Sequence, residues 1–246
     1  MIRIGIGGWT FAPWRGGAFY PDDLPQRREL EYASRRLTSI EINATYYGSQ
    51  KPESFQKWHD ETPEDFVFAL KGPRFATNRK VLAEAGDSVA RFLDSGIARL
   101  GAKLGPLNWQ LAETKTFDPQ DFAAFLALLP ASHDGLPLRH AVEARHDSFA
   151  GDEAAALCRD RGVALVRALD SKFPEIAADT ADFGYWRLMG TTDRANGYAD
   201  ADLDRWADMA RRAGKDRDLY LYVISGEKAR NPAAAMALID RLKDHP

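Results

Sequence analysis

The sequence lacks several features that would restrict what the protein does. Its 246 residues include one cysteine, Cys158, so an internal disulfide is excluded, and the Ala- and Leu-rich stretch around it indicates a small core thiol. No apolar run approaches the roughly 20 residues that a membrane span requires. No basic segment followed by an apolar one precedes the first strand, so we expect a cytoplasmic protein without a membrane partner.

Metal-ligand spacings and the common catalytic motifs are also absent. The five histidines, at positions 59, 133, 140, 146 and 245, form no HxH, HExxH or Cys/His pattern. There is no serine nucleophile elbow, no phosphate-binding loop and no catalytic Cys/His pair. The sequence therefore gives no indication of a metal or a cofactor, and it does not predict an oligomeric state.

Charge and composition describe an ordinary globular chain. The formal net charge is −3, which argues against attraction of the whole surface to nucleic acid or to an anionic membrane but leaves room for a local basic patch. Hydrophobic residues make up 45 % of the chain, which is enough for a substantial core.

Short apolar runs alternate with amphipathic stretches along the chain. We predict strands at 2–7, 38–43, 66–71, 107–111, 139–143, 163–167, 183–188 and 219–224. We predict helices at 26–37, 52–60, 85–100, 119–129, 152–161, 200–213 and 232–243. Asp118 and Asn231 each precede a proline and are expected to be N-caps.

This alternation predicts a mainly parallel sheet with helical crossovers. Eight such units in about 250 residues match a single-domain α/β TIM (β/α)8 barrel over residues 1–246. The sixth crossover, 168–182, is expected to hold a short or irregular helix. The alternative is an open doubly wound sheet, which needs a glycine-rich turn after the first strand, and "GIGGW" does not match GxGxxG.

Nearly every predicted strand ends in a charged or hydrogen-bonding side chain. In a barrel these ends and the loops after them form one functional face. The polar residues there are Glu41, Asn43, Thr45, Tyr46, Lys71, Arg74, Gln110, Glu143, Arg145, His146, Arg167, Asp170, Arg187, Tyr222 and Ser225.

The residue types on this face indicate an anionic ligand. Lysine and arginine dominate, and guanidinium groups suit phosphate or carboxylate. Glu41 and Glu143 are candidate general acid and base, with His146 as a proton shuttle. The alternative is structural: Arg145 pairs with Glu143, and Lys71 or Arg187 with Glu41, in a buried network that only stabilises the barrel.

Two further hypotheses follow from the loops. The aromatic residues of the first loop, Trp9 among them, form either a wall on which nucleic-acid bases stack or a hydrophobic plug. Nucleic acid is a less favoured partner than a small anion. Tyr198 lies in a long polar loop where a lid residue is expected. Metal-assisted hydrolysis would need two or more of Glu41, Glu143 and Asp170 to converge on one ion.

Several motifs carry a resemblance to a known family. The segments "GIGGWTFAPWRGGAFYPDDLP", "IEINATYYGS", "KGPRFAT" and "VEARHDSF" resemble the YecE-like family, catalogued as domain of unknown function 72. The resemblance implies a TIM barrel and brings no established activity. Where the family often shows an aromatic followed by paired asparagines, this chain has "YVISGEKARNP". Positions that match the family's motifs are Trp9, Glu41, Asn43, Thr45, Tyr46, Lys71, Pro73, Arg74, Gln110, Glu143, Arg145, His146, Arg187 and Tyr198.

Overall fold

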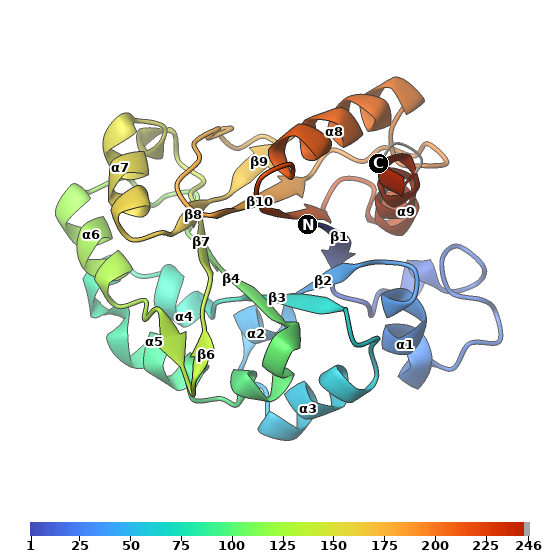
Figure 1. The fold of residues 1–246 in the computed structure, drawn as a ribbon, viewed down its shortest axis with the longest axis horizontal. Coiled ribbons are helices and arrows are strands. Elements are labelled where there is room, and N and C mark those ends of the chain that lie inside the picture. Colours follow the sequence, from blue (N-terminus) through green and yellow to red (C-terminus); the bar gives the residue numbers. More distant parts are fainter. Residues whose placement is uncertain (244–246) are drawn as a thin grey trace.

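The computed structural model describes residues 1–243, and its main sheet is a parallel ring of strands (Figure 1). The order around the sheet is β8-β7-β4-β3-β2-β1-β11-β10-β9. These strands are β1 (Ile2–Gly7), β2 (Ser39–Ile42), β3 (Val67–Lys71), β4 (Leu104–Gln110), β7 (His140–Glu143), β8 (Ala164–Leu165), β9 (Arg167–Leu169), β10 (Phe183–Leu188) and β11 (Asp218–Val223).

The two end segments of that order close the ring. β8 and β9 flank a single residue, Val166, whose N–H donates to the Val142 carbonyl at 2.9 Å. They are therefore halves of one strand that joins β7 on one side and β10 on the other. The result is an eight-stranded barrel, which confirms the predicted fold class and all eight predicted strands.

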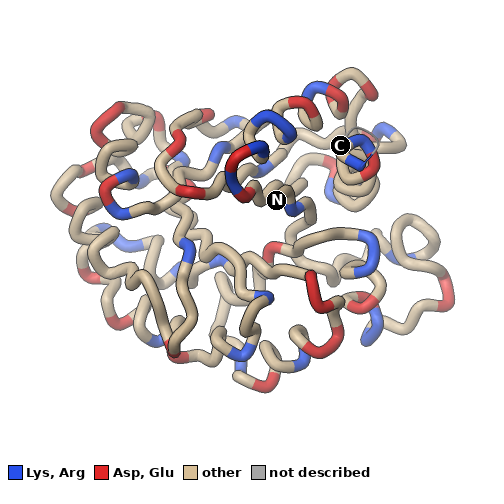
Figure 2. The backbone as a smooth tube through the Cα atoms, in the orientation of Figure 1, with Lys and Arg blue, Asp and Glu red and all other residues tan. Residues whose placement is uncertain are grey.

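Helices surround the ring, as the alternation predicted (Figure 1). The α-helices are α1 (Glu29–Ser34), α2 (Ala44–Tyr47), α3 (Pro52–Asp60), α4 (Arg74–Thr77), α5 (Gly86–Leu93), α6 (Pro119–Ala127), α7 (Asp152–Asp160), α8 (Asp200–Ala213) and α9 (Asn231–Lys243). Short 3-10 helices lie at Ala12–Trp14, Gln26–Arg28, Leu82–Ala85, Ile97–Lys103, Asp147–Phe149 and Lys228–Arg230. No helix among residues 1–243 is both long and apolar enough to cross a membrane. Basic and acidic residues are interspersed along the chain (Figure 2).

Two local expectations were wrong, and one hairpin was not predicted. The sixth crossover, 170–182, is fully described and contains no helix at all. Asn231 is the first residue of α9, with helical backbone, and its Oδ1 accepts from the Thr191 hydroxyl at 2.8 Å instead of capping. A small hairpin of β5 (Ser132–His133) and β6 (Leu136–Pro137) was not predicted, although its Asp134-Gly135 turn has the positive φ angles typical of a tight hairpin.

The alternation in β2 separates two buried environments. Ile40 and Ile42 are fully buried in the layer between strands and helices. Ser39 and Glu41 point the other way, into the barrel, where the Ser39 hydroxyl lies 2.7 Å from that of Tyr222. Because both faces of a barrel strand are buried, the polar residues of the alternation line the interior rather than solvent.

The N-cap of α6 gives a first testable prediction. The Asp118 carboxylate accepts from the Asp121 N–H at 3.0 Å, as expected from the sequence. Replacing Asp118 by alanine leaves that N–H without its partner, so we expect the free energy of unfolding to fall by about 1 kcal/mol in urea denaturation. Asp65→Ala, in an exposed turn, is the matched control. An equal loss in both variants would contradict the capping role.

Candidate functional site

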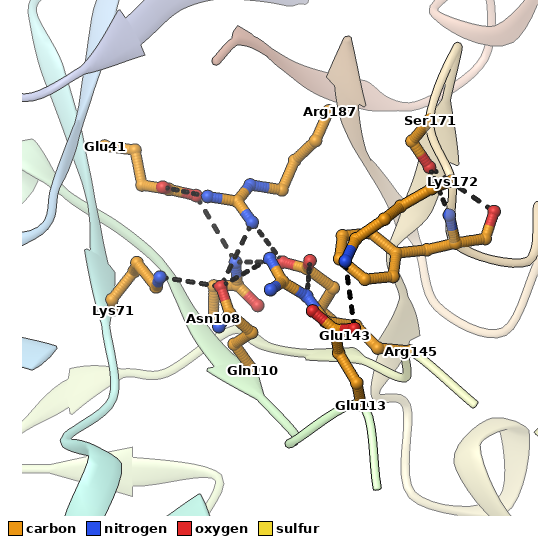
Figure 3. A network of polar contacts seen from close by, with 11 residues as sticks. Glu41, Lys71, Asn108, Gln110, Glu113, Glu143, Arg145, Ser171, Lys172 and Arg187 are labelled. Atoms are coloured by element: carbon orange, nitrogen blue, oxygen red, sulfur yellow. Dashed lines mark hydrogen bonds and ion pairs between the residues drawn. The ribbon is translucent and has the colours of Figure 1, made fainter. Parts of the chain in front are cut away.

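Polar side chains from five strands meet inside the C-terminal end of the barrel (Figure 3). We call this cluster the rim network. β2 supplies Glu41, β3 supplies Lys71 and β10 supplies Arg187, all as inward members of the strand alternation. The full set is Glu41, Lys71, Asn108, Gln110, Glu143, Arg145, Tyr185 and Arg187.

Arg187 lies between two buried carboxylates. Its Nη2 donates to Glu41 Oε1 at 2.8 Å and its Nη1 donates to Glu143 Oε2. Both glutamates have no exposed surface, and Arg187 is 3 % exposed. Tyr185 also donates its hydroxyl proton to Glu41, at 2.5 Å. The ion pairs weighed as a structural alternative are therefore present, since Arg145 Nε also donates to Glu143 at 2.7 Å.

One amide oxygen receives three cationic donors. Gln110 Oε1 accepts from Lys71 Nζ at 2.7 Å, from Arg145 Nη2 at 2.9 Å and from Arg187 Nη1 at 3.3 Å. A neutral carbonyl oxygen cannot neutralise these charges. With Lys71 protonated, the network holds three cations and two carboxylates, a net charge of +1. The oxygen atom thus marks a position of high positive potential.

Burial and neighbouring charges move the pKa values of this network in different directions. Burial alone would raise the pKa of the Glu143 carboxyl, but Arg187 and Arg145 outweigh it and the pKa is lowered. Burial would lower the pKa of Arg187, and the two glutamates raise it instead. For Lys71, burial and then the Arg187 charge lower the pKa to about 8, more than Glu41 and Glu143 raise it. Glu143 is therefore ionised at neutral pH, and Lys71 titrates just above neutral pH.

The rim network is layered from the interior to the mouth. The carboxylates are fully buried, whereas Lys71, Gln110 and Arg145 retain exposures of 6 %, 8 % and, for the arginine side chain, 17 %. Arg145 also lines a cavity of about 440 Å³ at the mouth. The remaining lining residues follow β9, β10 and β11: Asp170, Ser171, Lys172, Phe173, Met189 and Ser225. The charged side chains of this lining are two cations, Arg145 and Lys172, and one carboxylate, Asp170.

The helix-free segment 170–182 crosses this mouth. The Phe173 ring lies 4.2 Å from the Arg145 guanidinium. Lys172 Nζ contacts Glu113 Oε2, on the loop after β4, at 3.0 Å (Figure 3). Because Lys172 and Glu113 are both largely exposed, this second contact is weak and easily broken.

Two predicted residues of α2, which follows β2, support Lys71. The Thr45 hydroxyl donates to the Lys71 carbonyl at 2.7 Å, which fixes the backbone at the end of β3. The Tyr46 ring faces Lys71 Nζ at 4.2 Å from its centroid. Asn43 is half-buried and lies beside Gly7. A Cβ added at Gly7 would come within 2.8 Å of Asn43 Nδ2. These residues shape the site, and none is part of the ion pairs.

Other predicted residues lie outside the rim network. The Arg74 side chain is exposed and near the Phe75 ring. His146 Nδ1 accepts from the Ser148 N–H at 3.2 Å, which closes a local turn. Tyr198 is buried, and its oxygen accepts from the Gly190 N–H at 3.1 Å. Arg167 pairs with Glu175. The structure thus brings together Glu41, Lys71, Gln110, Glu143, Arg145 and Arg187, and it leaves Arg74, His146, Arg167 and Tyr198 apart from them.

The first-loop aromatics form a plug rather than a stacking wall. Trp14, Phe19 and Tyr20 are buried and pack edge to face or tilted against one another. Trp9 is half-buried and meets the Trp58 ring at a centroid distance of 5.4 Å. The buried rings of Trp14, Phe19 and Tyr20 have no free face on which a nucleic-acid base could stack.

Asn108 and Tyr185 were missed by the sequence prediction. Asn108 Nδ2 donates to Glu41 at 3.3 Å and to Glu143 at 3.4 Å, while its Oδ1 is buried without a hydrogen-bond partner in the described structure. Asn108 lies two residues before Gln110 on β4, and Tyr185 lies two residues before Arg187 on β10. The period-2 alternation therefore places them on the same face, and it was the signal that could have found them.

The donor set does not fit a metal ion. Among residues 1–243, no group of three or more His, Cys, Asp or Glu side chains is arranged to hold one. Glu41 and Glu143 already contact Arg187, so an ion between them would have to displace the guanidinium. Asp170 is exposed on the loop after β9.

These features define a single-domain TIM-barrel protein with a charged site at the carboxyl ends of its strands. The chain belongs to the family described as protein of unknown function DUF72, which it matches over residues 3–246. This confirms the resemblance read from the motifs.

Individual relatives agree with this assignment. The chain is 32 % identical over 180 residues to the UPF0759 protein YecE of Escherichia coli K12, an alignment that covers 70 % of this chain and 60 % of that relative's length. A DUF72 family protein of Thermotoga maritima superposes with a TM-score of 0.76 at 23 % identity, covering 99 % of this chain and 98 % of the other. Endonuclease IV from Thermus thermophilus reaches 0.54 at 14 % identity, covering 98 % and 99 %, which shows a shared fold alone.

Proposed function

We propose that the protein is an enzyme of hydrolase or lyase type that acts on a small phosphorylated or carboxylated substrate at the mouth of the barrel. The observation that carries this proposal is the convergence of Lys71, Arg145 and Arg187 on Gln110 Oε1. An anionic oxygen at that position would satisfy all three donors better than a neutral amide does. The adjoining cavity of about 440 Å³ has room for a small molecule.

The contacts favour different roles within the site from those that residue types alone suggested. Glu41 and Glu143 are fully buried and accept from arginine, so they hold the guanidinium groups in place and do not face the substrate. Lys71 has a pKa of about 8 and its Nζ lies beside the oxygen position proposed for the anion, so it is the better candidate for proton transfer near neutral pH. His146 is not assigned a role, because its contacts are local.

Anion binding tests the proposal. We expect inorganic phosphate and pyruvate, each titrated calorimetrically at pH 7, to bind at millimolar concentration or better. Arg145→Met should weaken binding about tenfold or more, because a charge-assisted hydrogen bond to a partly buried anion is lost. Arg205→Met, on the exposed face of α8, should bind as the unchanged protein does. Absence of binding for both anions, or equal binding by Arg145→Met, would contradict an anion site at the mouth.

A screen for turnover then separates an enzyme from a binding protein. Phosphate esters and carboxylated carbonyl compounds are the two classes to assay, since they match the two anion types that guanidinium binds. Substrates that are consumed by the unchanged protein should be consumed much more slowly by both Arg145→Met and Lys71→Met. Turnover that is insensitive to both substitutions would place the reaction elsewhere.

A further inference from the structure

Lys71 has an environment that is unusual for a buried lysine. The described contacts of its ammonium group are the Gln110 amide oxygen and the Tyr46 ring. No carboxylate oxygen among residues 1–243 forms an ion pair with it, although Glu41 and Glu143 lie in the same network. Buried lysines are ordinarily paired with a carboxylate, because an isolated buried charge is costly.

The neighbouring charges make the protonated form still less favourable. Arg145 and Arg187 bind the same oxygen atom as Lys71, so each guanidinium lies within two hydrogen-bond lengths of the amine. The carboxylates that face this group from β2 and β7 are already engaged by Arg187 and Arg145. A desolvated amine beside other cations is the arrangement that makes lysine a nucleophile, since it keeps the nitrogen lone pair free.

Building on the proposed anion site, we propose that the Lys71 amine forms an imine with a small carboxylate that carries an adjacent carbonyl group, the 2-oxo acid class. Arg145 and Arg187 are placed to bind the carboxylate, one oxygen of which would take the position of Gln110 Oε1. In a 2-oxo acid the carbonyl carbon is two bonds from that oxygen. The carbon therefore comes within reach of Lys71 Nζ, which lies 2.7 Å from the same position.

The covalent step balances with groups that are present. Neutral Lys71 Nζ bonds to the carbonyl carbon, and the carbonyl oxygen takes a proton to give a carbinolamine. Loss of that oxygen as water, which carries away both amine hydrogens, leaves a carbon–nitrogen double bond. A proton from solvent converts the imine to an iminium ion. The face of Tyr46 and the substrate's own carboxylate stabilise this cation, as the ring does for the ammonium group.

Reductive trapping tests the inference. The full chain is incubated at pH 8 with pyruvate and cyanoborohydride, which delivers hydride to the iminium carbon, and the adduct is located by peptide mass mapping. At that pH roughly half of Lys71 but only about 0.4 % of an ordinary lysine is neutral. We therefore expect trapping at Lys71 to be about 100-fold faster than at exposed Lys51. The modified mass equals that of the chain plus pyruvic acid, less water, plus two hydrogens.

Matched variants and ligands separate this inference from the proposed function. Lys71→Arg keeps a cation without a nucleophilic amine, so trapping should vanish. Lactate, which has no carbonyl group, should bind to the unchanged protein in calorimetry without forming an adduct. Trapping spread evenly over exposed lysines, or retained in Lys71→Arg, would overturn the imine. Binding of pyruvate and lactate without trapping would overturn it and leave the anion site intact. Absence of any binding would overturn both, and equal trapping of acetone would overturn the role of the carboxylate.

Discussion

Arg187→Met should lower the free energy of unfolding by about 3–5 kcal/mol, the largest loss we expect from a single substitution in the rim network. The guanidinium contacts Glu41 and Glu143, both without exposed surface. Its removal leaves two buried carboxylates, of which only Glu143 keeps an ion pair, with Arg145. Urea denaturation followed by circular dichroism measures the change.

The cause of that loss is testable by removing the charges that Arg187 neutralises. In the triple variant Glu41→Gln, Glu143→Gln, Arg187→Met, no buried carboxylate remains unpaired, so we expect a substantial part of the lost stability to return. Arg205→Met, whose partner Asp202 is exposed, should stay within about 0.5 kcal/mol of the unchanged protein. If the triple variant is as unstable as Arg187→Met alone, lost packing rather than unpaired charge is responsible.

The barrel could be predicted from the sequence because its signals are local. Each strand is a short apolar run, and the amphipathic helices between the strands carry polar residues on their exposed faces. Asp118-Pro119 starts α6 as expected, since an N-cap needs only neighbouring residues. The segment 170–182 was harder, because whether a polar crossover forms a helix depends on what it packs against, and here Phe173 packs on Arg145 instead.

The site was predictable as a set of residues but not as a set of contacts. Glu41 and Arg187 are 146 residues apart in sequence and lie on strands separated by β1 and β11. The strand ends place both at the mouth, yet the pairing depends on side-chain length and depth. Arginine reaches both carboxylates, whereas the shorter reach of Lys71 ends at Gln110. Because the pairing leaves Lys71 without a carboxylate, the chemistry of the site follows from geometry that no sequence motif records.

The stability contribution of Lys71 should depend on pH in a direction fixed by its lowered pKa. The folded-state pKa is about 8, below the roughly 10.4 of an unfolded lysine. Between these values the unfolded chain keeps a proton that the folded protein has released, so the free energy of unfolding rises with pH. The gain attributable to Lys71 is about 2.5 kcal/mol by pH 10 and is absent below pH 7.

Other groups titrate nearby, so the effect must be read as a difference between variants. Burial raises the pKa of Cys158 to about 12, and this thiol destabilises the fold as pH rises above 9. Buried Tyr185 and Tyr222, with pKa values well above 10, act likewise at higher pH. Lys71→Met leaves these groups unchanged. Subtracting its unfolding free energy from that of the unchanged protein therefore isolates the contribution of Lys71.

We expect this difference to be constant up to about pH 7 and then to shift by about 2.5 kcal/mol in favour of the unchanged protein by pH 10. Lys71→Met should itself fold well at pH 7, because the methionine side chain can rest on the Tyr46 ring without a charge to desolvate. Lys51→Met, at an exposed position, should give a difference that does not vary with pH. A flat difference for Lys71→Met as well would mean that the buried amine keeps an ordinary pKa, and the charge pattern around Gln110 would then not activate it.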